Sequence, residues 1–258
     1  MIVPNAMTGW LWVKQGLSLF RRQPAEVLTL FFSYMFLNMG IGLLPVLGQV
    51  LPLILIPVFS MSFMQACRQI DLGERVYPNL LLFGFRSPAF VRLLMLGVLY
   101  LIAATLAISI SRLFDGGAFW NFVTNQKPIG SDETPESGLL FGMLVSGLVY
   151  LPALMGFWFA APLIAWKQMS LPKALFYSYF SVFRAGKAFL VYGFAWMMIG
   201  IVLPTIISLI IAVIVGKATI VVLAMMPVSA ILTAVMYCSF FPIYLQIFGK
   251  PDVEDQPS

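Results

Sequence analysis

Long apolar runs dominate the pattern of hydrophobic and polar positions along this chain. Six of them contain no Asp, Glu, Lys, Arg or His: Val27–Leu44, Val46–Ala66, Leu93–Ser111, Leu139–Ile164, Ala188–Val215 and Thr219–Phe248. A helix needs about 20 mostly apolar residues to cross the hydrocarbon layer, where only structures that satisfy every backbone group internally are stable. The pattern therefore predicts an all-α membrane protein with six transmembrane helices.

The segment before the first run has a different period. Its apolar residues recur at spacings of three and four positions: Trp10, Val13, Leu17 and Phe20. Polar side chains fill the opposite side, which is the pattern of an amphipathic helix lying in the membrane interface. We expect residues 1–24 to form this interfacial helix and Pro24 to end it, because proline disfavours a helical conformation of the residue before it.

The segment after the fourth run has a similar pattern. Ser170 is a candidate N-cap, and Pro172 falls in the first helical turn. We expect one apolar face and more polar neighbours that include Ser178 and Ser181; the apolar face consists of Leu171, Leu175, Tyr179 and Val182. A weaker, more apolar version of the segment runs from Tyr77 to Phe85, before the third run.

These three segments suggest an internal repeat. A Phe-Arg pair closes each segment directly before an odd-numbered run: Phe20-Arg21, Phe85-Arg86 and Phe183-Arg184. Three repeats, each with an interfacial segment, an outward span and a returning span, would explain the recurrence. The alternative is that Phe-Arg recurs at a membrane edge without common descent.

The charged residues sort by the side of the membrane. The net charge is +5, from 15 basic and 10 acidic residues. Twelve basic residues lie beside one set of run ends: Lys14, Arg21, Arg22, Arg68, Arg75, Arg86, Arg92, Lys167, Lys173, Arg184, Lys187 and Lys250. Arg112, Lys127 and Lys217 lie beside the other set. Because basic residues in short loops stay cytoplasmic, we predict cytoplasmic termini and a periplasmic loop at residues 114–138.

The composition favours a single integral membrane domain. Hydrophobic residues make up 61% of the chain and charged residues only 10%, against about 25% charged in soluble domains. We assign residues 1–250 to one membrane domain and expect residues 251–258 to form a disordered acidic tail. The first residues lack the basic segment of a signal peptide, so we expect no cleavage. The positions of the charges argue against nucleic acid as a partner.

Few residues offer catalytic chemistry. The chain has no histidine, the commonest general base. Cys67 and Cys238 lie in different runs, where a thiol behaves as a small hydrophobe, so we expect no disulfide and no metal cluster. Asp71 and Glu74 are close enough in sequence to hold a cation or act as acid and base, but their context is typical of a turn whose charges face water. We expect no enzymatic activity, no metal and no cofactor.

Polar and small residues inside the runs mainly indicate helix packing. Asn38 is difficult to leave facing lipid, so we expect it to contact another helix. Gly138, Gly142 and Ser146 recur every four positions, which permits close helix approach in the bundle or in an oligomer. Prolines within the runs predict kinked helices, and broken helices also form binding sites in transporters.

The basic residues at the cytoplasmic run ends are the strongest candidate site. Each Lys or Arg near an anionic leaflet contributes about 1 kcal/mol of attraction, and an arginine can hold a phosphate with two parallel hydrogen bonds. We predict that anionic phospholipid headgroups are contacted by Arg21, Arg22, Arg86 and Arg184. The alternative is that these residues only set the topology.

Motifs concentrated in the first 70 residues resemble a known family. They are Trp10-x-Trp12-x-x-x-Gly16-x-x-x-Phe20-Arg21-Arg22-x-Pro24, Leu44-Pro45-x-x-Gly48 and Phe63-Met64-x-Ala66-Cys67-Arg68. Together they resemble an uncharacterised, locus-tag-named family of proteobacterial multi-pass inner-membrane proteins. The six-span layout is more distantly similar to YciC-type and glycerophosphodiesterase-associated membrane domains. The resemblance implies a Gram-negative inner membrane and supplies neither an activity nor catalytic residues.

Three functional hypotheses remain open. The first is a non-enzymatic protein that organises lipids or protein partners at the cytoplasmic leaflet, with membrane lipids, a second copy or another membrane protein as partners. The second is a small transporter or lipid-moving protein for an apolar or amphiphilic substrate, driven passively or by a partner because the spans lack ionisable residues. The third is membrane-anchored catalysis at Asp71 and Glu74.

Overall fold

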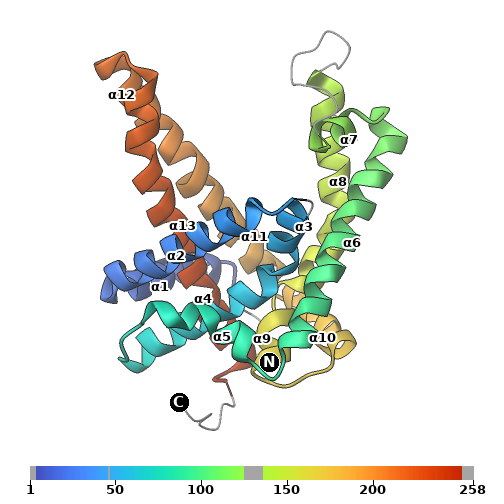
Figure 1. Cartoon of the computed structure of the whole chain (residues 1–258), viewed down its shortest axis with the longest axis vertical. Coiled ribbons are helices and arrows are strands. Elements are labelled where there is room, and N and C mark those ends of the chain that lie inside the picture. Colours follow the sequence, from blue (N-terminus) through green and yellow to red (C-terminus); the bar gives the residue numbers. More distant parts are fainter. Residues whose placement is uncertain (1–3, 46, 125–135, 252–258) are drawn as a thin grey trace.

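A computed structural model describes residues 4–45, 47–124 and 136–251 of the chain (Figure 1). Every regular element within these ranges is a helix. Residues 125–135 of the predicted periplasmic loop (114–138) and residues 252–258 of the predicted acidic tail (251–258) lie outside the described residues.

The helices follow the predicted runs closely. The first third of the chain forms α1 (Thr8–Arg22), α2 (Pro24–Gly42), α3 (Leu47–Ile54) and α4 (Ile56–Leu72). The middle third forms η1 (Pro78–Leu82), α5 (Phe83–Arg86), α6 (Phe90–Asp115), α7 (Ala118–Val123), α8 (Glu136–Phe157) and α9 (Ala160–Ala165). The last third forms α10 (Leu171–Arg184), α11 (Gly186–Met197), the π-helical turn η2 (Met198–Val202), α12 (Leu203–Val215) and α13 (Ala218–Phe248).

Five helical segments are long and apolar enough to cross a membrane: Pro24–Gly42, Phe90–Asp115, Gly138–Ala165, Gly186–Val215 and Ala218–Phe248. The pair α3 and α4 makes a sixth if its two bent halves count as one span. The structure thus confirms an all-helical protein with five or six candidate spans.

Prolines account for the breaks inside the predicted runs. A proline has no N–H, so the carbonyl four residues before it loses its helical partner. Pro57 lies at the start of α4, next to a bend of 44° between α3 and α4. Pro162 lies in the first turn of α9, and Pro204 directly follows the π-helical turn η2. The bend beside Pro57 agrees with the predicted kinks, whereas Pro52, Pro152, Pro227 and Pro242 lie inside continuous helices.

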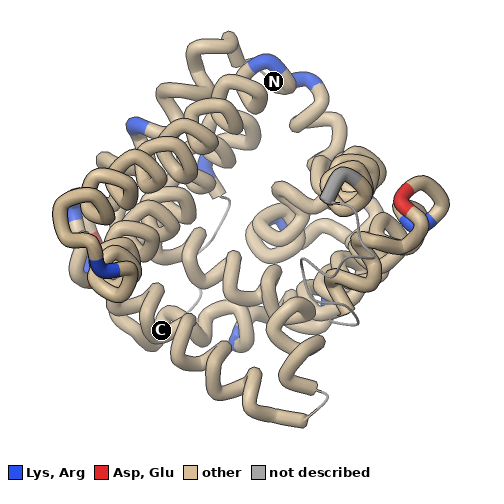
Figure 2. Tube along the Cα trace, turned by 90° about the horizontal axis from the view of Figure 1, so that it is seen from above, with Lys and Arg blue, Asp and Glu red and all other residues tan. Residues whose placement is uncertain are grey.

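Three segments pack in cyclic order on the spans. Helix α1 lies on α13 and α11, η1 and α5 lie on α4, and α10 lies on α8 and α9. The segment η1–α5 thus contacts α4, which ends the two runs before it, and α10 contacts α8 and α9, which end the next two runs. The first segment, α1, contacts the last helix, α13. Seen from above, the lysines and arginines are spread around the body rather than gathered at one place (Figure 2).

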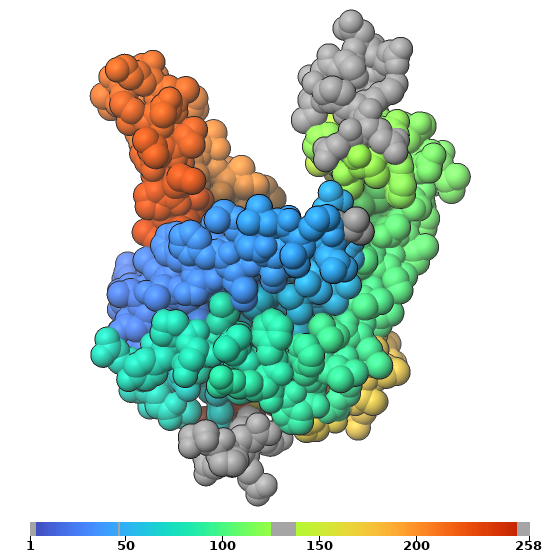
Figure 3. All heavy atoms as spheres, in the orientation of Figure 1, coloured from blue at the N-terminus to red at the C-terminus, as the bar shows by residue number. Residues whose placement is uncertain are grey.

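The chain divides into a body and two arms (Figure 1). One arm consists of α6 and α8, with α7 packed against both near the tip. The other arm consists of α12 and the first part of α13. The body contains α1, α4, α5, α9 and α10, and the space-filling view shows an open notch between the arms, above α2 and α3 (Figure 3).

The buried core lies in the body. Its largest fully buried side chains include Trp12, Phe59, Phe159, Phe241 and Tyr244. By contrast, α12 has no buried residue, and none of the hydropathy window of span Gly186–Val215 is buried within the protein. An arm that is apolar on all sides is suited to lipid as its surroundings.

The buried face of α1 differs from the predicted one. The predicted apolar face included Trp10, which is 39% exposed, whereas Trp12 is completely buried. The buried stripe also contains Gly9 and Gly16. A Cβ atom on Gly16 would lie 2.6 Å from the Cα atom of Ser239, so glycine lets the backbone of α1 touch α13. The buried face of α1 is therefore the one on which glycine allows the two backbones to approach closely.

The predicted apolar face of α10 is only part of its buried face: Val182 is buried, and Leu171 and Leu175 pack against the core, as expected. Ser178 and Ser181, expected among the more polar neighbours, are buried with Ala174 and Val182. The exposed surface is aromatic instead, with Phe176 61% and Phe183 65% exposed. Small residues bring α10 close to α8 and α9, and the hydroxyl of Ser178 finds backbone partners there.

Candidate functional site

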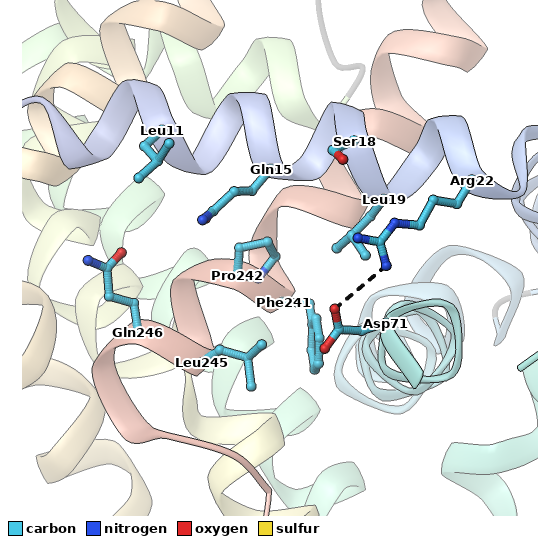
Figure 4. Close-up of a pocket in the computed structure, with 10 residues that line it drawn as sticks. All are labelled: Leu11, Gln15, Ser18, Leu19, Arg22, Asp71, Phe241, Pro242, Leu245 and Gln246. Carbon is cyan, nitrogen blue, oxygen red and sulfur yellow. Dashed lines mark ion pairs between the residues drawn. The ribbon is translucent and has the colours of Figure 1, made fainter. Parts of the chain in front are cut away.

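A groove of about 420 Å³ lies between α1, the end of α4 and the end of α13 (Figure 4). Figure 4 shows Gln15 of α1 pointing toward Pro242 and Gln246 of α13, and Arg22 of α1 pointing toward Asp71 of α4 at one end of the groove. The lining combines apolar side chains with polar groups: Leu11, Gln15, Ser18, Leu19, Arg22, Asp71, Phe241, Pro242, Leu245 and Gln246.

Tight packing of α1 holds the groove open. The indole Nε1 of Trp12 donates a hydrogen bond of 2.5 Å to Oε1 of Gln246, and the Trp12 ring lies 5.3 Å from the Phe189 ring. The hydroxyls of Tyr192 and Ser239 are 2.6 Å apart beneath α1. These contacts hold α1 against α11 and α13, and Arg22 lies in its last turn.

Arg22 has a weak partner in the groove. Its Nη1 lies 3.9 Å from Oδ1 of Asp71, and the two side chains are 54% and 44% exposed. Exposed ion pairs of this kind contribute about 0–1 kcal/mol. A phosphate that offers two parallel hydrogen bonds is a stronger partner for a guanidinium, so Arg22 is able to exchange Asp71 for an anionic ligand.

The turn after α4 is tied to the start of α2. Nε2 of Gln23 donates to the carbonyl oxygen of Glu74 at 2.6 Å, and the Val76 amide donates to Oε1 of Gln23 at 3.0 Å. Nε of Arg75 lies 3.3 Å from Oε1 of Glu26. These contacts fix the end of α4 beside α1, and they keep Asp71 opposite Arg22.

The four arginines predicted to contact headgroups do not form one cluster. Arg21 and Arg22 end α1, Arg86 ends α5 and Arg184 ends α10, and all four are exposed. Their helices pack on three different parts of the body. Only Arg22 lines the groove, and contact of the four with lipid stays a prediction.

A second basic pair was missed by sequence reasoning. Nη1 of Arg92 donates to the carbonyl oxygens of Gln168 at 3.2 Å and Met169 at 3.1 Å. Nζ of Lys167 donates to the carbonyl oxygen of Phe248 at 3.2 Å, at the end of α13. The charge pattern placed Arg92 and Lys167 at the same set of run ends, but backbone carbonyls so distant in sequence leave no signal in it, so only the fold reveals these partners.

The carboxylates considered for catalysis have structural contacts. Asp71 lies in the last turn of α4 and faces Arg22, and the left-handed Gly73 begins the turn that contains Glu74. No group of three or more potential metal ligands occurs among the described residues. The arrangement places Asp71 beside the guanidinium of Arg22 at one end of the groove.

The two cysteines lie together, which the sequence did not predict. Cys67 of α4 and Cys238 of α13 are both buried and free, and their thiols are within hydrogen-bonding reach. The expected absence of a disulfide agrees with these free thiols. Their contact shows that α4 and α13 pack closely behind the groove.

Comparison with known proteins identifies a relative. The chain is similar to the probable inner membrane protein BTH_II0599 of Burkholderia thailandensis, with 37% identity over 254 residues. The match covers 96% of this chain and 94% of the relative. No family model matches the chain, and no solved structure matches it.

Proposed function

Because this chain belongs to the family of the Burkholderia thailandensis probable inner membrane protein, we propose that it organises anionic lipids or protein partners at the cytoplasmic leaflet, without catalysis. The family and the apolar helices make it a multi-pass inner membrane protein. The observation that carries the proposed role is Arg22, which lines an amphipathic groove and has only a weak, half-exposed partner.

The proposal places the body on the cytoplasmic side. The hydrogen bond between Trp12 and Gln246 joins the first helix to the end of the last, so both lie in the body. Arg112 and Lys217 lie near the ends of the two arms, Lys127 lies outside the described residues, and we assign the remaining twelve basic residues to the opposite side. This distribution follows the positive-inside rule.

Reporter fusions test this orientation. A periplasm-active reporter joined after Thr124 should be active, and one joined after Lys250 should be inactive, with the reverse pattern for a cytoplasm-active reporter. If the fusions after Thr124 and after Lys250 report the same side of the membrane, the orientation is wrong. The proposed contact with the cytoplasmic leaflet would then be wrong as well.

Helix α10 supports contact with the membrane interface. Its exposed surface is aromatic, with Phe176, Phe180 and Phe183 all outside the protein core. Nζ of Lys173 lies 6.0 Å from the centre of the Tyr177 ring, and Arg184 ends the helix. Aromatic rings beside basic groups are typical of the headgroup level, so we place α10 there, together with α1.

The cyclic packing of the three segments supports the proposed triplication. A chain of three two-span units would place each interfacial segment on the returning span of the unit before it, as α1, α5 and α10 lie. Arg21, Arg86 and Arg184 would then occupy corresponding corners of the body, from which three headgroups are contacted separately.

Lipid mass spectrometry on the full-length protein in native membrane discs tests the proposed role. We expect enrichment of anionic phospholipid over the surrounding membrane. Arg22→Gln should lower the enrichment by up to about fivefold, which corresponds to about 1 kcal/mol for one arginine near an anionic leaflet. The matched control is Arg112→Gln at the opposite side, which should change nothing. No enrichment in the wild-type protein, or an equal effect of both variants, would contradict the proposal for lipids.

The broken helices favour a second candidate function. The spans formed by α3–α4 and α8–α9 are interrupted, and interrupted helices form substrate sites in transporters. A small transporter or lipid-moving protein would carry an apolar or amphiphilic substrate between the arms. Reconstituted vesicles that show no protein-dependent movement of labelled lipid or amphiphile would exclude this function.

A further inference from the structure

A second cavity, of about 200 Å³, lies where the two arms meet the body. Its walls come from four regions, α4, α6, the α8–α9 junction and α13, and it is lined by residues that include Ser60, Tyr100, Leu154, Phe157, Trp158 and Phe240. We name it the arm-base pocket. Six of its ten lining residues are aromatic, which makes it suited to an apolar occupant.

The pocket lies beside a broken helix, and three backbone groups near the break have side-chain partners. The hydroxyl of Tyr100 donates to the carbonyl oxygen of Phe157 at 3.1 Å. The hydroxyl of Ser178 donates to the carbonyl oxygen of Met155 at 2.8 Å and accepts from the Phe159 amide at 2.9 Å. A broken helix can bind polar substrates through exposed backbone groups. Here the carbonyls of Met155 and Phe157 and the amide of Phe159 are bonded within the protein, and most of the lining is aromatic, so hydrocarbon is the matching ligand.

Two helices give the depth of the pocket independently. In α6, Tyr100 lies eight residues after Arg92, and in α13, Phe240 lies eight residues before Phe248, whose carbonyl accepts from Lys167. Eight helical residues span about 12 Å. Half of the hydrocarbon layer is about 15 Å thick, so the pocket lies at the acyl-chain depth of the leaflet beside Arg92 and Lys167.

We propose that the arm-base pocket binds one acyl chain of an anionic phospholipid from the cytoplasmic leaflet. The pocket is smaller than the roughly 300–1,000 Å³ of sites that enclose a whole small ligand, so it holds part of a chain whose remainder lies in the notch between the arms (Figure 3). This inference rests on the proposed function for the choice of leaflet and headgroup.

Photolabelling tests the acyl-chain site. The full-length protein is reconstituted in phosphatidylethanolamine vesicles that contain phosphatidylglycerol with a diazirine in the middle of one acyl chain. After illumination, peptide mass spectrometry locates the label. We expect label on Tyr150, Leu154 and Trp158 in severalfold excess over the lipid-exposed α12. Labelling at equal density on α12 and the pocket would overturn the proposal, because it would show only the lipid that surrounds any membrane protein.

Variants that fill the pocket from opposite walls sharpen the result. Ser60→Leu adds bulk from α4 and Leu154→Phe adds bulk from α8, so each should lower pocket labelling severalfold. The matched control is Thr105→Leu, at an exposed position of α6 where the hydroxyl bonds only the Leu101 carbonyl in its own helix; it should leave labelling unchanged. Size-exclusion profiles identify a variant that fails to fold. Wild-type labelling in both folded filling variants would overturn the proposal.

Two further experiments separate this inference from the proposed function. Arg22→Gln should reduce headgroup enrichment yet leave label in the pocket, because Arg22 does not line it. Loss of pocket labelling with headgroup enrichment intact would overturn the acyl-chain site alone. A free fatty acid that carries the same diazirine is the second probe: strong labelling by the fatty acid, with none by phosphatidylglycerol, would show that the occupant is not a phospholipid.

Discussion

The body and the arms use their polar side chains in opposite ways. In the body, polar groups connect elements far apart in sequence: Trp12 bonds Gln246, and Ser178 bonds the backbone at Met155 and Phe159. In the arms, exposed threonine hydroxyls bond carbonyls of their own helix, as Thr105 does to Leu101 and Thr205 to Ile201, whereas Tyr100, where α6 meets the body, bonds the Phe157 carbonyl. Lipid supplies no hydrogen-bond partner, so an arm side chain turns back to its own backbone.

Asn38 of α2 follows the pattern of the arms. Its amide was expected to contact another helix, but Nδ2 donates to the carbonyl oxygen of Tyr34 in the same helix, at 2.9 Å. The difference shows that a polar residue in a span does not by itself predict a helix contact. Only a polar residue at a site of close approach, such as Ser178, joins two elements.

The largest effect should come from filling the contact between α1 and α13. Gly16→Val would place Cβ 2.6 Å from the Cα atom of Ser239, which overpacks the body and should cost about 3 kcal/mol or more. The matched arm variant is Gly147→Val, because nothing lies within 4 Å of a Cβ there. Thermal unfolding in detergent should show a large loss for the first variant and a small change for the second. Equal losses would mean that the distinction between body and arms is wrong.

An intermediate effect should follow from removing one hydroxyl. Ser178→Ala leaves the buried Phe159 amide without its acceptor, which should cost about 1–3 kcal/mol. Ser208→Ala in α12 removes only a bond to the Thr205 carbonyl, and we expect a change of about 0.5 kcal/mol or less there, as at other surface positions. Chemical or thermal unfolding of both variants measures the difference. A neutral Ser178→Ala would contradict its role in bridging α8 and α9.

The smallest effect on stability should come from the groove. Asp71→Asn removes an exposed ion pair, so the expected loss is about 1 kcal/mol or less. Anionic lipid retained on purification should rise, because Arg22 loses its competing carboxylate. The control is Glu26→Gln, which removes the pair with Arg75 outside the groove lining. A fall in retained lipid would mean that Asp71 assists binding and does not compete with it. Added salt should weaken retention in all variants.

The residue pattern predicted most of the helices because membrane spans are encoded locally. Absence of charge over about 20 residues is a property of a continuous segment, and it located α2, α6, α8, α11–α12 and α13. The pattern did not reveal α7, a short helix inside the predicted periplasmic loop, whose amides at Gly117 and Phe119 bond the carboxylate of Asp115. It identified only part of the buried face of α1, with Val13 and Phe20, and of α10, with Val182.

The candidate site was only partly accessible from the sequence. The charge asymmetry identified Arg22 as a candidate, but Asp71 was considered for catalysis and not as its partner. The contact of Cys67 with Cys238, and the basic pair Arg92 and Lys167, join residues more than 70 positions apart. No periodicity carries such information, since it depends on which helices approach each other.

The sequence by itself determined that this protein is helical with up to six candidate spans, and it predicts that the basic residues favour one side, because hydrophobicity and charge act on each segment independently. Only the tertiary structure decided which faces meet, which arginine lines a groove and where the arms leave a pocket. Those features depend on backbone approach at Gly16 and on hydrogen bonds from Trp12 and Ser178, and both arise only when distant segments pack.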